Sequence, residues 1–181
     1  MLILPLMLLA FLGACSRRKT EVTLHASLIQ IYDNFSEEGK PVEEEKYSRK
    51  IHMVFRIFNF TNDSLYIPLF TIGGGYKSTI YYWIDGEKDY SYATIYTNSD
   101  FMSARILPPQ EFINLGINVY ERNLPNKNVS LDWLRGNINF KYVVDDVERK
   151  EHDLVVPEIV FTTNDSNVRY FYEDPNRYDP I

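Results

Sequence analysis

Hydrophobic and polar residues alternate with a period of two along most of the chain. In the stretch 113–119 every second residue is aliphatic, with asparagine or glycine between, and the stretch 138–144 alternates in a similar way. Such a period places successive side chains on opposite faces of an extended strand. The predicted strands are 22–32, 51–58, 78–85, 89–97, 113–119, 137–144 and 154–162.

Turn-forming residues separate these strands. Clusters of Gly, Pro, Asn, Asp or Ser occur at 38–41, 61–64, 85–86, 108–109 and 145–146, and clusters of this kind end strands. The only helix expected is a turn around Ser130–Leu134, with Ser130 as its N-cap. Seven or eight short strands predict an all-β fold, an antiparallel β-sandwich, with an up-and-down barrel as the alternative.

Two stretches resemble parts of bacterial immunoglobulin-like domains. Residues 54–68 are similar to the passage between strands B and C of those domains, where an Asn-bearing polar turn links two core strands. Residues 107–111, directly before Phe112, are similar to their proline-led strand entry. The resemblance implies an immunoglobulin-like β-sandwich, but without the Cys-Trp-Cys spacing of antibody-type domains.

The first fourteen residues are uncharged and largely apolar. As a helix, the apolar run 2–12 would span roughly 16 Å, about half a bilayer core, which is the length of a signal-peptide apolar region. The run ends in Leu12-Gly13-Ala14-Cys15, which resembles the lipobox of bacterial lipoproteins. That resemblance implies cleavage before Cys15, diacylglycerol on its sulfur and acylation of the new amino terminus. The alternative is a buried N-terminal strand with an incidental cysteine.

The lipoprotein resemblance also predicts a location and a domain plan. Ser16 follows the cysteine where, in the family, an Asp would favour the inner membrane, so we expect an outer-membrane lipoprotein facing the periplasm. We expect residues 1–14 to be the signal peptide and 15–20 a lipidated tether whose basic residues lie near anionic headgroups. A β-sandwich domain should then cover 21–163. The tail 164–181 is either loose or packs its aromatic residues on the domain, and we favour partial packing.

Composition narrows the class of function. The chain has 181 residues, of which 45% are hydrophobic, enough for one domain with a core. It has 19 Lys and Arg against 25 Asp and Glu, a net charge of −6, which argues against nucleic acid as a partner. The single cysteine excludes a disulfide scaffold and a cysteine-built zinc site.

No set of residues predicts catalysis, and no cofactor is expected. His25, His52 and His152 lie on separate predicted strands or strand ends without metal-ligand spacing, so we interpret them as ordinary edge or surface residues. The chain has no Gly-x-Ser-x-Gly motif, and the glycine-rich stretch 71–78 lacks the Gly before Lys and the following helix of a phosphate loop. The acidic runs 43–45 and 145–146 are interpreted as solvated turns.

An aromatic hairpin is the most informative feature of the body of the chain. A two-residue turn at Asp85-Gly86 would pair Trp83 with Lys88 and Tyr81 with Tyr90. A four-residue loop keeps the same division of side chains between the two faces, whereas a three-residue loop destroys it. One face then carries Tyr81, Trp83, Tyr90, Tyr92 and Tyr96, and the other is mainly aliphatic.

The aromatic face has two interpretations. Exposed Tyr and Trp offer flat contact area and hydrogen-bonding groups, which suit binding to proteins or sugars. Alternatively, the rings fill the sandwich interior or only stabilise cross-strand pairs. Separately, Asp63-Ser64-Leu65 matches an O-glycosylation sequon of exported proteins, which would modify Ser64, although Ser64 is equally a turn residue.

These observations lead to a functional expectation. We expect a lipid-anchored, non-enzymatic β-sandwich that holds a protein partner in the periplasm, in envelope assembly, hydrolase inhibition or toxin immunity. The acidic balance would suit a basic partner. The alternative is an accessory lipoprotein that binds a glycan with the aromatic hairpin.

Overall fold

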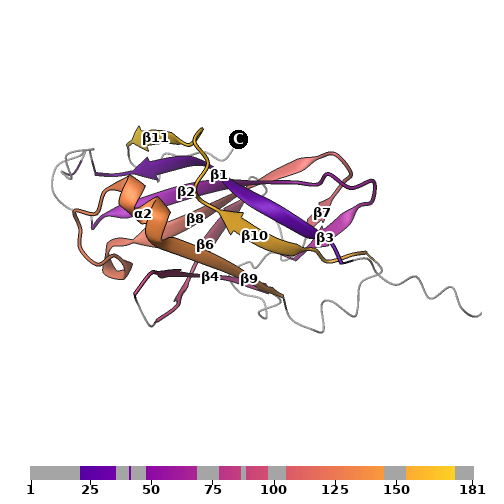
Figure 1. Cartoon of the computed structure of the whole chain (residues 1–181), viewed down its shortest axis with the longest axis horizontal. Helices are drawn as coiled ribbons and strands as arrows, with labels where there is room; N and C mark the ends of the chain where they lie inside the picture. The colour runs from indigo at the N-terminus through magenta and orange to yellow at the C-terminus, as the bar shows by residue number, and fades with distance from the viewer. Residues whose placement is uncertain are drawn as a thin grey trace, which may run out of the picture.

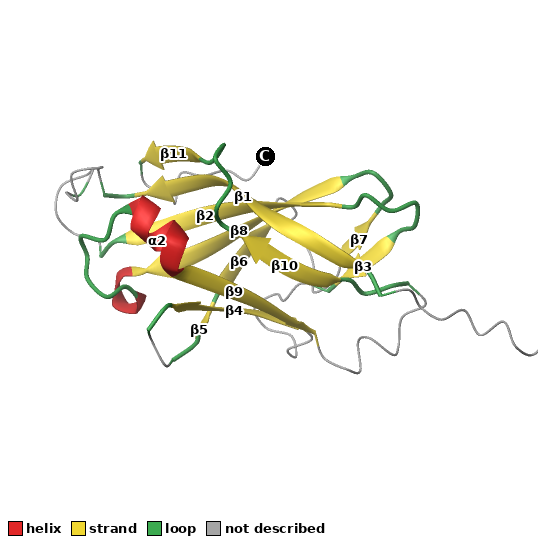
Figure 2. Cartoon of the chain, viewed as in Figure 1, coloured by secondary structure: helices red, strands yellow, loops and turns green. Residues whose placement is uncertain are grey.

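The computed structural model describes residues 21–35, 41, 48–68, 78–86, 89–97, 105–144 and 154–173. Residues 1–20, which include the predicted signal peptide, Cys15 and the predicted tether, lie outside this part of the chain. Within it the protein is all-β, as predicted, with one short α-helix, α2 (Leu131–Asn137), and a 3-10 turn, η1 (Glu121–Asn123) (Figure 2). The strands are β1 (Thr23–Asp33), β2 (Lys50–Phe58), β3 (Leu65–Ile67), β4 (Ser78–Ile84), β5 (Ser91–Tyr92), β6 (Thr94–Thr97), β7 (Arg105–Leu107), β8 (Phe112–Tyr120), β9 (Ile138–Val144), β10 (Glu158–Thr162) and β11 (Arg169–Tyr172).

The larger layer of the sandwich is a six-stranded sheet. Its order is β10-β1-β2-β8-β6, and β11 also pairs with β1. The order β1-β2-β8-β6 matches the A-B-E-D sheet of immunoglobulin folds. The sheet is mixed rather than purely antiparallel as predicted. The eleven-residue β1 is long enough to pair in parallel with β10 along its first half and with β11 along its second.

The second layer contains the three-stranded sheet β5-β4-β9, and a third pair, β3-β7, lies at one end (Figure 1). The stretch 89–97, predicted as one strand, is divided at Ala93. β5 pairs with β4, whereas β6 pairs with β8 in the six-stranded sheet. The Ala93 amide donates to the carbonyl of Ile80 at 2.8 Å, which completes the contact with β4 before the chain changes sheets.

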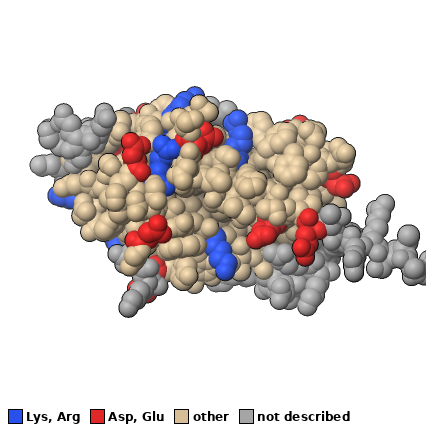
Figure 3. All heavy atoms as spheres, in the orientation of Figure 1, with Lys and Arg blue, Asp and Glu red and all other residues tan. Residues whose placement is uncertain are grey.

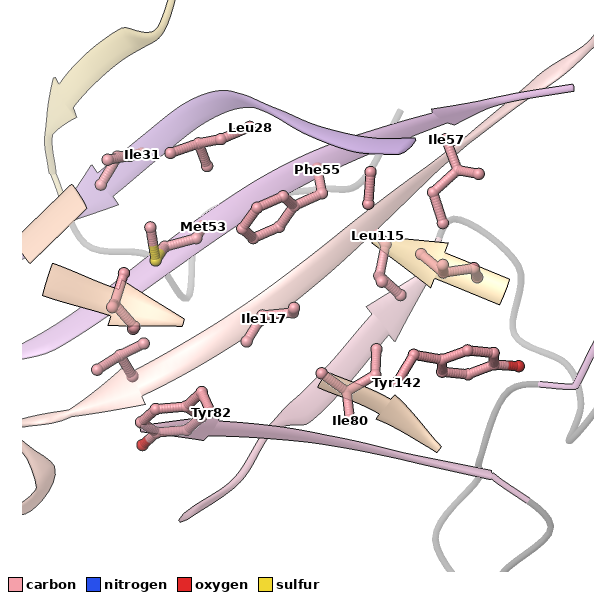
Figure 4. Packing of buried hydrophobic residues seen from close by; sticks show 14 of the residues in the cluster. Leu28, Ile31, Met53, Phe55, Ile57, Ile80, Tyr82, Leu115, Ile117 and Tyr142 are labelled. Carbon is pink, nitrogen blue, oxygen red and sulfur yellow. The ribbon is translucent and has the colours of Figure 1, made fainter. Parts of the chain in front are cut away.

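The core lies between the two layers. Phe55 of β2 points toward the smaller sheet, from which Ile80, Tyr82 and Tyr142 point into the same core (Figure 4). The Phe55 ring meets that of Phe140 edge-on, with ring centres 5.1 Å apart. Tyr82 and Ile80 of β4 are almost fully buried on the inner side of their sheet. Burying a large apolar side chain of this kind contributes about 1.5–3 kcal/mol. The alternation of the predicted strands therefore marks the buried face correctly.

The pairing of β2 with β8 defines two ends of the sandwich. The pairing of β2 with β8 runs without interruption from Lys50 opposite Tyr120 to Phe58 opposite Phe112. Eight strand steps of about 3.4 Å make this distance about 27 Å. The chain enters β1 at the Phe58 end, because Ala26 pairs with Ile57, and we call this the entry end. The other end, with Lys50 and Tyr120, is the distal end, and α2 lies toward it (Figure 1).

The domain extends beyond the boundary expected at residue 163. In β11, Phe171 stacks on Tyr32 of β1 with ring centres 4.7 Å apart. The Tyr170 hydroxyl donates to Asp132 in α2 at 2.6 Å and accepts from Arg135. Aromatic residues 170 and 171 therefore belong to the sandwich, and 174–181 lie outside the described residues. The predicted helix cap is also present, since Ser130 Oγ accepts from the Trp133 amide at 3.2 Å.

Candidate functional site

The aromatic hairpin is formed by β4 and β5, and its register differs from the simplest prediction. Tyr81 pairs with Tyr92, and Tyr82 pairs with Ser91. Each partner is two positions later than a two-residue turn at Asp85-Gly86 would give. Gly86 has φ of +90°, a left-handed backbone conformation that glycine adopts without strain. Because a shift of two preserves parity, the predicted division of faces holds for the four residues Tyr81–Ile84.

The aromatic side of the hairpin faces solvent. Tyr90 is 63% exposed and Tyr92 is 66% exposed, while Tyr81 and Trp83 are half-buried. On the opposite side of β4, Ile80, Tyr82 and Ile84 are buried in the core. The rings of residues 81, 83, 90 and 92 therefore do not fill the sandwich interior.

The exposed rings contact one another across the strands. Tyr81 and Tyr92 lie with ring centres 5.0 Å apart and planes inclined by 42°. Trp83 and Tyr90 lie 5.1 Å apart in an edge-on arrangement at 73°. A pair of this kind contributes about 0.5–1.5 kcal/mol beyond the burial of its area. Cross-strand support therefore accounts for part of the aromatic content, and the inclined rings form ridges rather than a flat platform.

Polar side chains of β9 continue this surface. Lys141 pairs with Tyr81 and Asn139 with Trp83, so both lie beside rings on the outer side of the sheet. Asn139 Nδ2 donates to Asp85 Oδ1 at 2.7 Å. Partial burial, together with the adjacent Tyr92 hydroxyl, raises the pKa of Tyr81. We call this surface the hairpin face, formed by Tyr81, Trp83, Tyr90, Tyr92, Asn139 and Lys141.

Tyr96 does not belong to the hairpin face, contrary to the prediction. It lies in β6 and pairs with Gly116 of β8 in the six-stranded sheet. The error came from treating 89–97 as one strand, since parity carries a side chain to the same face only while the chain stays in one sheet. Conversely, Asn139 and Lys141 were missed. Their polar alternation along 137–144 was visible, but the pairing of β9 with β4 was not.

Ser64 lies in an ordered turn after β2. The turn is organised by Asn59, which is fully buried and whose Nδ2 donates to the carbonyls of Asp63, Leu107 and Pro108 at 2.9–3.0 Å. The Oδ1 atom of Asn59 accepts from the amide and hydroxyl of Thr61. Ser64 itself is half-buried. The structure thus gives this serine a turn position, and its glycosylation stays a prediction.

Two of the three histidines are described, and they do not meet. His25 is exposed on β1, as expected, but His52 is buried, which corrects its interpretation as an edge or surface residue. His52 Nδ1 lies 2.7 Å from Asn118 Oδ1 on β8. Burial lowers the pKa of His52, while the Asn118 bond opposes that effect. His152 lies outside the described residues.

The described residues contain no cluster of side chains suited to a metal ion. Among the residues that the structure describes, no three His, Cys, Asp or Glu side chains gather as they would around a metal ion. The acidic runs 43–45 and 145–146 and the glycine-rich residues 71–77 fall outside that part of the chain. A depression of about 720 Å³ lies at the distal end, with Tyr120, Glu121 and Lys127 in its lining.

Sequence reasoning missed a buried polar cluster around Arg49. Arg49 and Asp33 form a buried ion pair with Nη2 and Oδ2 2.6 Å apart. Arg49 Nη1 donates to the carbonyls of Lys127 and Val129 at 2.8 and 2.7 Å, and the Arg49 amide donates to Glu121. Burial raises the pKa of the Asp33 carboxyl, and the guanidinium opposes this rise. The arrangement joins β1, β2 and the segment before α2, which is a structural role.

Comparison with known proteins gives no identity. No protein-family model matches the chain, and no curated protein or solved structure is significantly similar to it. Within the described ranges, no helix has the length and apolar character needed to cross a membrane. The hairpin face is therefore the main indication of function in the described part of the chain.

Proposed function

We propose that this protein is a lipid-anchored, non-enzymatic binding module of the bacterial envelope that holds a protein partner through its hairpin face. The observation that carries the proposal is the exposure of Tyr90 and Tyr92 on a sheet whose other side is packed in the core. The lipid anchor is Cys15, and the domain faces the periplasm from the outer membrane.

The chemistry of the hairpin face suits a protein interface. Tyr and Trp are enriched at the residues that contribute most binding energy, because they present large area with little conformational freedom to lose. Here the two ring pairs hold each other in place, which reduces the entropy lost on binding. Lys141 and Asn139 supply polar groups at the edge of the rings, like the polar rim of an interface.

The overall charge of the chain gives a second, long-range contribution to the proposed interaction. On the side of the molecule that Figure 3 shows, positive and negative side chains are interspersed over the surface. The net charge of −6 favours association with a basic partner at long range. The aromatic contacts then determine the lifetime of the complex. A module of this kind would serve in envelope assembly, hydrolase inhibition or toxin immunity.

A glycan is the second candidate ligand. It is favoured by the position of Asn139 beside Trp83, which places an amide next to an indole ring. Sugars bind by stacking their apolar faces on such rings while amides and hydroxyls bond their oxygens. The inclination of the rings, 42° and 73° within the two pairs, speaks against an extended flat polysaccharide.

Site-specific photo-crosslinking separates these candidates. A photoreactive phenylalanine analogue at Tyr92 of the full-length protein, activated in intact cells, should give one dominant protein adduct. The matched control places the analogue at Trp133, which is exposed on α2 and outside the hairpin face, and should not give that adduct. A Trp83 fluorescence change with oligosaccharides and no adduct would favour the glycan. If both the protein adduct and the fluorescence change are absent, the result contradicts a binding role for this face.

A further inference from the structure

A second group of exposed apolar side chains lies at the entry end. Phe58 and Phe112 are neighbours across β2 and β8, and they are 42% and 47% exposed. Phe60, in the turn after β2, and Ile106, on β7, are each 58% exposed. Single exposed apolar residues are common, whereas a group of them at one end of a domain is typical of an interaction surface. We call Phe58, Phe60, Ile106 and Phe112 the phenylalanine end.

The backbone beneath these side chains is held firmly. Buried Asn59 bonds the β2–β3 turn to the segment after β7. Gln110 has φ of +59°, an uncommon conformation for a residue with a side chain. Its Nε2 donates to the carbonyls of Phe60 and Thr61 at 3.1 and 3.2 Å, which holds the two turns together. The apolar side chains are thus presented by an ordered scaffold.

The chain reaches the domain at this same end. The Val22 carbonyl accepts from the Glu158 amide at 2.8 Å, and the nearby Val155 carbonyl accepts from Tyr66, the strand partner of Ile106. Six residue steps separate Cys15 from Glu21. Even fully extended, they reach about 20 Å. A lipid on Cys15 would therefore hold the entry end, and not the distal end, close to the bilayer.

We propose that the phenylalanine end contacts the bilayer surface, with Phe60 and Ile106 entering the boundary between headgroups and acyl chains. This inference rests on the proposed lipid anchor. Phe and aliphatic side chains bind this boundary by burying apolar area. A short tether keeps them at high effective concentration beside it, so weak contacts suffice.

The charged neighbours set the orientation more than the affinity. The Arg56 guanidinium carbon lies 4.2 Å from the centre of the Phe112 ring, and its N–H groups are donors for lipid phosphates beside that ring. Asp63 and Glu111 are exposed at the same end, so attraction to anionic lipids does not drive the contact. Apolar burial does, and the long axis of the sandwich then points the hairpin face away from the membrane.

Quenching by brominated lipid tests the contact. The full-length acylated Phe60→Trp protein is reconstituted in vesicles of phospholipid brominated on its acyl chains. The added tryptophan emission should shift to the blue and fall by about twofold relative to unbrominated vesicles. The matched control, Tyr90→Trp, replaces a similarly exposed residue at the distal end and should show no quenching.

Palmitate incorporation distinguishes failure of the contact from failure of the anchor. Labelled palmitate should enter the natural protein and be lost in Cys15→Ala. Labelled protein without quenching of Phe60→Trp overturns the membrane contact and leaves the anchor in place. Absence of label overturns both. A protein adduct captured by a photoreactive residue at Phe60 would show a protein occupant and would also overturn the contact.

Discussion

The hairpin face and the phenylalanine end are both exposed and aromatic, yet they differ in chemistry. The hairpin face carries Tyr and Trp, whose polar groups can bond water when no ligand is bound, and it is flanked by Asn139 and Lys141. The phenylalanine end carries Phe and Ile, which have no such group. The Tyr and Trp side chains of the hairpin face suit a surface that is solvated when free and buried when a partner binds. The Phe and Ile side chains of the phenylalanine end suit lasting contact with an apolar phase.

The two regions are also supported differently. At the distal end, the buried Asp33–Arg49 pair joins β1 and β2 to the segment before α2, and Asn123 of η1 donates to Ser91 of β5 at 2.6 Å. At the entry end, the two turns are linked by neutral groups, the buried Asn59 amide and the Gln110 side chain. The aromatic surfaces are thus carried by separate polar supports beyond opposite ends of the β2–β8 pairing, and each can be weakened without the other.

The largest effect is expected from Arg49→Met. This change removes a buried cation and leaves the Asp33 carboxylate without its counter-charge, which should lower the free energy of unfolding by about 3–5 kcal/mol. Urea denaturation followed by circular dichroism measures the change. The control is Arg56→Met, which changes an exposed arginine in β2, the strand that follows Arg49, and for which we expect less than about 1 kcal/mol. Equal losses would contradict the structural role of the buried pair.

Asn59→Ala should weaken the opposite end. It removes three donated and two accepted hydrogen bonds in a buried site, and the carbonyls of Asp63, Leu107 and Pro108 each lose one donor. We expect a loss of about 2–3 kcal/mol. Hydrogen exchange should accelerate in residues 59–64 and 107–111 while β4 and β9 stay protected. Asn62→Ala, exposed in the same turn, is the control and should change stability by less than about 0.5 kcal/mol.

A pH dependence is expected from His52 in the strand that connects both regions. Because burial holds its pKa below the usual value of about 6.5, the unfolded chain binds a proton that the folded chain does not. Stability should therefore fall as pH falls below about 6.5, by at most about 1.4 kcal/mol per pH unit, until the folded pKa is passed. The slope of unfolding free energy against pH should decrease in His52→Asn. The matched control is His25→Asn, the same substitution at an exposed position of β1.

Sequence reasoning predicted what depends on alternation. The strands around residues 51–58, 113–119 and 137–144 were found with their buried faces, because one side of each packs on the core and the pattern records it. Strands β3 and β7, of three residues each, were missed because so short a stretch shows no periodicity. The parity of the hairpin face was likewise predictable, since loops of two and four residues give the same partition.

The predictions that failed concerned residues whose positions depend on tertiary partners. The division of 89–97 between two sheets is decided by β8, which lies about twenty residues later and offers Ile117 as partner for Ile95. The Asp33–Arg49 cluster joins Arg49 to carbonyls 78 and 80 residues away. No local pattern encodes such a meeting. His52 was interpreted as exposed because alternation predicts one solvated face, whereas part of the outer side of this sheet is covered.

The smallest predicted effect decides what the exposed rings are for. A double-mutant cycle of Tyr90→Ala and Trp83→Leu isolates the coupling energy of the edge-on pair, for which we expect about 0.5–1.5 kcal/mol. The parallel cycle of Tyr92→Ala and Tyr81→Leu measures the inclined pair. Urea midpoints of the single and double variants give both energies.

If the coupling accounts for the full stability loss of Tyr90→Ala, the rings serve the fold, and the hairpin face loses its support as a binding surface. If partner crosslinking is lost in variants whose stability is nearly unchanged, the rings serve recognition, because ring support and partner binding then separate at the same residue.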